Sequence, residues 1–214
     1  MAGGFGARTV LSMSGLPTLP RAKVVGLSAV LFSALYLLSD AVEAVQGGFS
    51  EPQLWMTFVA EAAIPVFVIG LYLVQRPQIR WSSRFGALAY AYSFVFFTGT
   101  VVYALVNGIS DYKTLSDDLA PWMTIHGALM VVAGSWFAYA VIIARVLPRW
   151  TGIALMAGVV MVAASQGLSE PLQLLAAATR DLGFAGMGAA LLGLGAKSGR
   201  RTGAGRPVGP SLAS

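Results

Sequence analysis

The chain has 214 residues, of which 57% are hydrophobic and only 11% are charged, whereas a soluble domain carries about 25% charged residues. This composition excludes an ordinary soluble protein and indicates an integral membrane protein. The absence of cysteine and the single histidine exclude disulfides, thiolate metal sites, cysteine nucleophiles and haem or metal sites that need several histidine ligands.

Six stretches are apolar over about 20 residues, the length that a helix needs to cross a bilayer. We therefore expect an all-α polytopic membrane protein, a six-transmembrane-helix bundle formed by residues 23–196. Residues 1–22 are predicted to be a disordered lead, and the basic residues 197–214 a disordered tail. The predicted spans are 24–46, 54–75, 85–107, 121–144, 150–168 and 171–196.

The basic residues predict the orientation of these spans. All Lys and Arg residues except Lys113 and Arg180 fall before the first span, after the last, or in the connections after the second and fourth. The positive-inside rule therefore places both termini in the cytoplasm of a multi-pass protein of the cell membrane. The net charge of +5 is a topology signal, and no nucleic-acid partner is expected.

Two nearly identical pentapeptides, GFSEP at 48–52 and GLSEP at 167–171, each precede a span. Serine is a favoured N-cap, Pro is tolerated in the first helical turn, and Glu there meets the positive end of the helix dipole. Helix capping alone explains both copies, and we rank it ahead of a ligand role for Glu51 and Glu170.

Charged residues also occur inside the spans, where each costs about 2.5–3.5 kcal/mol on insertion scales and normally faces a bundle interior. Asp40 and Glu43 lie in the first span, Glu61 in the second, and the pair Arg180 and Asp181 in the last. Tyr36, Asp40 and Glu43 share one face of a helix. We expect these acids to surround one polar cavity in the outer half of the membrane.

His126 lies at a similar predicted depth in the fourth span, on one face with Trp122, Met130 and Phe137. A lone histidine in a membrane helix either packs through a hydrogen bond to a neighbouring helix or transfers protons, and both interpretations stay open. In the second interpretation, His126 joins the acids around the cavity.

Aromatic residues are frequent in the spans, above all in the third. Each one taken singly fits lipid contact, helix packing or an interfacial belt. Together they fit a pocket for a large apolar ligand, with ring faces that stabilise cationic charge. The residues predicted to bind substrate are Tyr36, Trp55, Phe58, Tyr90, Phe94, Phe97, Trp122 and Arg180.

Buried acids with aromatic walls fit cofactor-free, acid-initiated cyclisation of an isoprenoid. An apolar site favours a neutral carboxylic acid, which protonates an alkene or epoxide, while a carboxylate or His accepts the final proton. Glu61 and Asp181 are the first candidates for acid and base, followed by Asp40, Glu43 and His126. No metal is expected, since the adjacent pair Asp117–Asp118 is more simply an N-terminal cap and dipole partner for the following helix.

The size, the spans, the intramembrane acids and the segment LAYAYSFVFF (88–97) together resemble the small bacterial integral membrane terpene cyclases. These enzymes, of the drimentine or indole-sesquiterpene type, are functionally akin to fungal meroterpenoid cyclases. The resemblance covers residues 24–196 in general character. It implies protonation-initiated cyclisation of a prenylated substrate in terpenoid natural-product biosynthesis, with that substrate and the lipid bilayer as partners.

Two other functions stay open. The intramembrane charges also fit the proton relay of a small carrier, in which Pro65 breaks the second span. A non-catalytic accessory subunit is the third hypothesis, because Gly183, Gly186 and Gly188 allow close helix contact and homo-oligomerisation through the last span.

Overall fold

Each of the six apolar segments forms a helix in the computed structural model, which describes residues 19 to 203 and side chains from 21 to 193. The described part of the chain is all-helical and has no strand. A seventh, short helix lies between the third and fourth apolar segments. The helices are α1 (Leu19–Gln46), α2 (Glu51–Val74), α3 (Ser83–Asn107), α4 (Tyr112–Asp118), α5 (Trp122–Ala144), α6 (Arg149–Ala164) and α7 (Glu170–Gly203).

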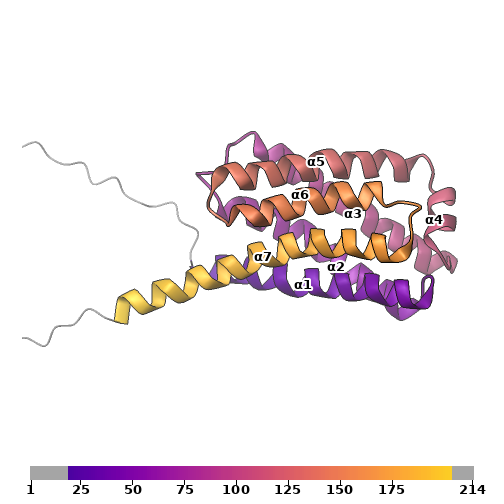
Figure 1. Ribbon diagram of the computed structural model, residues 1–214, viewed down its shortest axis with the longest axis horizontal. Helices are drawn as coiled ribbons and strands as arrows, with labels where there is room; N and C mark the ends of the chain where they lie inside the picture. The colour runs from indigo at the N-terminus through magenta and orange to yellow at the C-terminus, as the bar shows by residue number, and fades with distance from the viewer. Residues whose placement is uncertain (1–18, 204–214) are drawn as a thin grey trace, which may run out of the picture.

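The six long helices form a closed ring in which each packs against the next, and α7 closes the ring against α1 (Figure 1). The short helix α4 lies across one end, which we call the α4 end. The opposite end, where α1 begins and α7 leaves the bundle, is called the terminal end (Figure 1). Helix α7 continues past the predicted boundary at residue 196 to Gly203, and the rest of the predicted tail and lead lies outside the described residues.

Four of the helices, α1, α2, α3 and α5, are long and apolar enough to cross a membrane. Helix α6 is apolar but has only 16 residues. Large apolar side chains are exposed on the outside of the bundle, for example Val66 at 74% and Leu175 at 56%. In a membrane these side chains contact lipid tails, which makes the exposure favourable.

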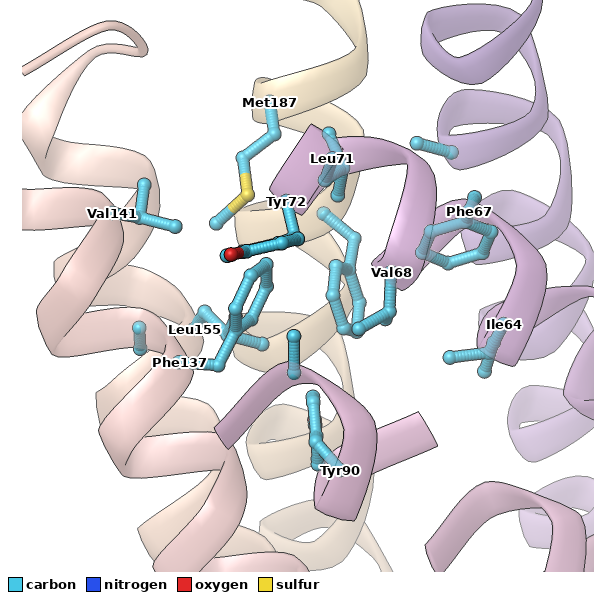
Figure 2. Close-up of a cluster of buried hydrophobic side chains, with 14 of the residues drawn as sticks. Ile64, Phe67, Val68, Leu71, Tyr72, Tyr90, Phe137, Val141, Leu155 and Met187 are labelled. Carbon is cyan, nitrogen blue, oxygen red and sulfur yellow. The ribbon is translucent and has the colours of Figure 1, made fainter. Parts of the chain in front are cut away.

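The interior is packed mainly with aromatic and aliphatic side chains. The Phe67 ring meets the Phe184 ring edge to face at 5.1 Å, and Tyr90 stacks on Phe184 at 6.1 Å. Figure 2 shows this core, in which Tyr72 lies between Met187 and Phe137. The largest fully buried side chains are therefore aromatic, and they fill the centre of the ring of helices.

Glycines set the closest helix contacts. A Cβ on Gly26 of α1 would meet the carbonyl oxygen of Gly188 at 2.8 Å, and a Cβ on Gly183 would meet Leu155 of α6 at 2.6 Å. Gly186 packs on the Trp150 ring. The glycines of α7 that the sequence singled out as a packing surface therefore make their contacts within one chain, as small residues do between membrane helices.

Both SEP segments begin helices, as predicted. Glu51 is the first residue of α2 and Glu170 the first residue of α7. Ser50 has extended backbone angles typical of an N-cap, but its side chain makes no capping hydrogen bond. The acid and the proline of the motif thus take their expected places, whereas the predicted serine cap does not form in α2.

Helix α4 is a feature that the sequence analysis missed. Asp117 and Asp118 end this helix, and Pro121, with no side-chain hydrogen bond, is the N-cap of α5. The prediction that the Asp pair caps the following span was therefore wrong. The reason is that Asp111, seven residues before Asp118, is the N-cap of the separate helix α4, and the Asp pair lies at the end of that helix.

We predict that Asp111→Ala loosens α4. The backbone N–H of Thr114 donates to Asp111 Oδ1 at 2.8 Å and its hydroxyl donates to Oδ2 at 2.9 Å, and these bonds lower the pKa of Asp111. The folded-state pKa of Asp111 therefore lies below the unfolded value of about 3.9. The stabilisation of α4 by the Asp111 carboxylate is fully present above about pH 3.9 and is lost as the pH falls through the folded-state pKa.

Peptide-level hydrogen exchange over residues 112–118, corrected for intrinsic rates, should show faster exchange in Asp111→Ala at pH 7. Wild type should approach the variant only as the pH falls below the unfolded pKa of about 3.9 and through the lower folded pKa. Asp117→Ala, which removes only the exposed pair with Lys113, is the matched control and should change little. Equal protection of wild type and Asp111→Ala at pH 7 would contradict the prediction.

Candidate functional site

Three polar side chains on three helices lie at the same depth in the bundle. Tyr36 is ten residues from the end of α1, and Glu61 and Arg180 are each ten residues from the starts of α2 and α7. All three of these helix ends are at the α4 end (Figure 1). At 1.5 Å per residue, this places the three residues about 15 Å from that end, close to half the thickness of a hydrocarbon core.

Arg180 is the centre of a buried ion cluster. Its Nε and Nη2 donate to the two carboxylate oxygens of Asp181 at 2.9 and 3.1 Å, and Nη2 also reaches Asp40 Oδ2 at 3.5 Å. Arg180 is 5% exposed and Asp181 is 2% exposed. Charges this deep are tolerated only when they are paired, so α7 and α1 are held in a fixed register here.

The cluster extends to Glu61 through Tyr36. The guanidinium carbon of Arg180 lies 4.3 Å from the centre of the Tyr36 ring, which is a cation–π contact. The Tyr36 hydroxyl donates to Glu61 Oε1 at 2.5 Å. The other oxygen, Oε2, is buried and has no hydrogen-bond partner among the described residues.

A second polar group lies between this cluster and the α4 end. Gln53 Nε2 donates to Ser39, to Thr57 and to Glu43 Oε2 at 3.1, 3.0 and 3.3 Å, and the Ser39 and Thr57 hydroxyls are 2.5 Å apart. Glu43 is only partly buried. Polar groups therefore lead from the α4 end to mid-depth. We call the following residues the polar seam: Tyr36, Ser39, Asp40, Glu43, Gln53, Thr57, Glu61, Arg180 and Asp181.

The sequence analysis named six members of the polar seam and missed Ser39, Gln53 and Thr57. A signal for them was present in the spacing. Gln53, Thr57 and Glu61 are four residues apart and so lie on one face of α2. Uncharged polar residues are common in membrane helices, so hydropathy alone does not distinguish this face.

His126 does not join the carboxylates, contrary to the expectation of one shared cavity. It lies on α5, which packs against α3 and α6. Its ring stacks on Phe96 at 3.6 Å, its Nε2 is 3.3 Å from the Tyr92 hydroxyl and its Nδ1 is 2.9 Å from the carbonyl oxygen of Trp122. These contacts are those of a packing histidine, the first of the two interpretations.

The aromatic residues predicted to line one pocket are divided among several places. Tyr90 and Phe94 are fully buried in the core, and Tyr36 belongs to the polar seam. Trp55 and Phe58 line an open groove of about 560 Å³ between α2 and α3 at the α4 end. Predicted residues that touch neither feature are Phe97, which packs on Phe96, and Trp122, which is 58% exposed.

No protein-family model, curated protein or solved structure matches this chain. Its function is therefore inferred from the polar seam. The seam offers Glu61, a carboxyl group whose Oε2 has no partner among the described residues, and Asp40, a carboxylate whose Oδ2 lies 3.5 Å from Arg180 Nη2. Two acids in such different surroundings can take opposite roles in proton transfer.

Proposed function

We propose that all six long helices cross the membrane, with the α4 end outside and both termini in the cytoplasm. The closed ring supports this, because α6 and α7 complete it beside four helices long enough to span. Arg76, Arg80 and Arg84 lie in and near the α2–α3 connection, Arg145 follows α5 and Arg149 begins α6, so all five belong to the terminal end. Their location fits the positive-inside rule.

We propose that the chain is a membrane-embedded enzyme that performs cofactor-free acid–base chemistry, with protonation-initiated cyclisation of a prenylated substrate as its reaction. The observation that carries this proposal is the buried, unpartnered Glu61 Oε2. Among the described residues no cation is hydrogen-bonded to Glu61, and an unpaired buried charge is costly. The neutral acid is therefore the form we assign to Glu61, and its Oε2 is free to hold and give a proton.

In the proposed reaction, Glu61 transfers its proton to one carbon of a substrate double bond, and a second double bond of the substrate attacks the carbocation so formed. A carbon next to the final cation then loses a proton, so the product is an isomer of the substrate. We assign this last proton to Asp40, because both oxygens of Asp181 are bonded to Arg180. The Tyr36 hydroxyl, which donates to Glu61 Oε1, holds the acid in position.

The proton-coupled carrier is the second candidate, and one observation favours it: the polar seam connects mid-depth to the α4 end. A carrier must also open to the opposite side. Toward the terminal end the core is apolar, with Phe67, Leu71 and Met187 buried, and α2 continues without a break through Pro65. A polar seam that reaches only one end of the bundle fits an enzyme better. No observation favours the third hypothesis, a non-catalytic accessory subunit, over the other two.

We predict that Glu61→Gln lowers product formation by a factor of about 10²–10⁴, the usual contribution of a general acid. Membranes containing the full chain would be given linear prenylated aromatic compounds, and products would be separated by chromatography and detected by mass spectrometry. Cyclisation leaves the mass unchanged and alters the retention time. Asp40→Asn should also lower product formation, whereas Glu170→Gln, at the exposed start of α7, is the matched control.

The variants must remain folded, which gel filtration in neutral detergent would check. His126→Ala should retain product formation, because His126 does not contact the polar seam. Full activity of a folded Glu61→Gln variant would overturn the assignment. Failure of wild type to convert any substrate, together with proton-dependent uptake into vesicles, would favour the carrier.

A further inference from the structure

Charge is divided unevenly between the two ends of the bundle. All nine acidic residues of the chain lie at the α4 end or between it and the depth of Asp181. No side-chain carboxylate is therefore available to the basic residues of the terminal end, and the anions that balance them come from the surroundings. Seven basic residues with described side chains belong to this end: Arg21, Lys23, Arg76, Arg80, Arg84, Arg145 and Arg149.

One of these residues, Arg84, is held in place by aromatic rings. It is the second residue of α3, and its guanidinium carbon lies 3.6 Å from the centre of the Trp81 ring and 5.4 Å from that of the Phe85 ring. A ring face attracts a cation at this distance. Because the Trp81 ring covers the face of the planar guanidinium, the edge that carries its N–H donors stays available.

These donors have no partner in the described part of the chain. The Nε atom of Arg84 is buried and unpartnered, whereas its two Nη atoms are not buried and form no ion pair with a described residue. Arg76, in contrast, donates to the buried hydroxyl of Tyr72 at 3.3 Å. Arg84 thus presents a fixed, planar set of free donors, which is the arrangement that binds a phosphate or carboxylate through two hydrogen bonds.

The rings around Arg84 indicate its level in the membrane. Trp81 and Phe85 meet edge to face at 6.1 Å and are 54% and 53% exposed. Trp150, at the start of α6 and at the same end, is 49% exposed. Exposed tryptophans gather at the level of the lipid headgroups. Arg84 therefore lies where lipid phosphates are found, with apolar ring surface beside it for a lipid chain.

The neighbouring charges select among lipid headgroups. Arg76 and Arg80 lie in the same connection between α2 and α3, and like charges repel. They would oppose the amine of a zwitterionic lipid near Arg84, whereas they attract a headgroup with a net negative charge.

We propose that Arg84 and Trp81 form a binding site for the phosphate group of an anionic phospholipid in the leaflet at the terminal end. The Nη atoms of Arg84 donate to the phosphate oxygens, and the exposed rings of Trp81 and Phe85 contact the acyl chain. The proposed orientation makes this leaflet the cytoplasmic one. The recognition of the phosphate does not depend on that orientation or on the proposed reaction.

The test uses the full chain purified in neutral detergent, with phosphatidylglycerol as the probe and phosphatidylcholine with the same acyl chains as the matched probe. Phosphatidylglycerol should raise the melting temperature by several degrees and phosphatidylcholine should not. By native mass spectrometry, Arg84→Gln should weaken phosphatidylglycerol binding by a factor of about 10–100, the effect of losing a hydrogen bond between charged groups. Arg149→Gln removes an exposed charge from the same end and should weaken it about fivefold at most.

Two further variants separate the site from the general charge of this end, and they serve also if Arg84→Gln does not fold. Arg84→Lys keeps the charge but loses the planar donors, so its affinity should lie nearer that of Arg84→Gln than that of wild type. Trp81→Leu keeps the charge and removes the ring that holds it, and it should also weaken binding. Wild-type affinity in both of these variants would overturn the proposal.

Other outcomes would contradict the site as well. Equal melting shifts with the two lipids, or equal losses in Arg84→Gln and Arg149→Gln, would mean that no phosphate site exists at Arg84. If glycerophosphoglycerol, the headgroup without acyl chains, acts as strongly as the lipid, the lipid assignment is wrong. Selective phosphatidylglycerol binding by a protein that converts no prenylated compound would support this site and contradict only the enzyme, so the two proposals fail separately.

Discussion

Replacing Arg180 by methionine is expected to lower the free energy of unfolding by about 3–5 kcal/mol, the usual effect of removing one partner from a buried ion pair. The change leaves Asp181, which is 2% exposed, without its two hydrogen bonds from Arg180. It also removes the cation near Asp40 and above the Tyr36 ring. Unfolding in mixed micelles of neutral detergent and dodecyl sulfate would measure the loss.

A double variant distinguishes the ion pair from simple packing. Arg180→Met combined with Asp181→Leu removes both charges of the closest pair, so it should be more stable than Arg180→Met alone, and the two single effects should not add. Lys113→Met, which breaks only the exposed pair with Asp117, is the control and should change stability little. Strict additivity of the two buried changes would mean that Arg180 and Asp181 do not stabilise each other.

The helices were predictable because the apolar segments are long and separated by polar turns. All six predicted segments are helices in the structure, and four of them are long and apolar enough to span a membrane. The intramembrane charges were also predictable as an interior cluster, since each is costly in contact with lipid. Asp40, Glu61, Arg180 and Asp181 do come together.

Other features depend on the rotation of one helix against another, which hydropathy does not record. His126 has the depth of the acids, but α5 turns it toward Phe96 on α3. Tyr90 and Trp55 looked alike in the sequence, yet one is fully buried and the other is 51% exposed. Similarly, the packing of α7 against α1 brings Arg180 to Tyr36. A contact between the first and last helices cannot be predicted from a local sequence pattern.

Gly158→Ala is expected to lower the free energy of unfolding by about 1–3 kcal/mol, the range for overpacking. The added methyl group would meet the backbone nitrogen and Cα of Arg180, which, unlike a flexible side chain, cannot turn away. Helices α6 and α7 must therefore separate. Gly127→Ala on α5 is the matched control, because no heavy atom lies within 4 Å of the new methyl group; it should be stabilising by about 0.5–1 kcal/mol.

Gly158→Ala should also impair the proposed reaction, although Gly158 bears no polar group. A displacement of α7 moves Arg180 away from the Tyr36 ring and from Asp40, and Tyr36 is the residue whose hydroxyl donates to Glu61. Because the guanidinium–Asp40 distance is already 3.5 Å, a shift of a few tenths of an ångström breaks that bond. A folded Gly158→Ala variant with the stability and product formation of wild type would show that the α6–α7 contact does not position the polar seam.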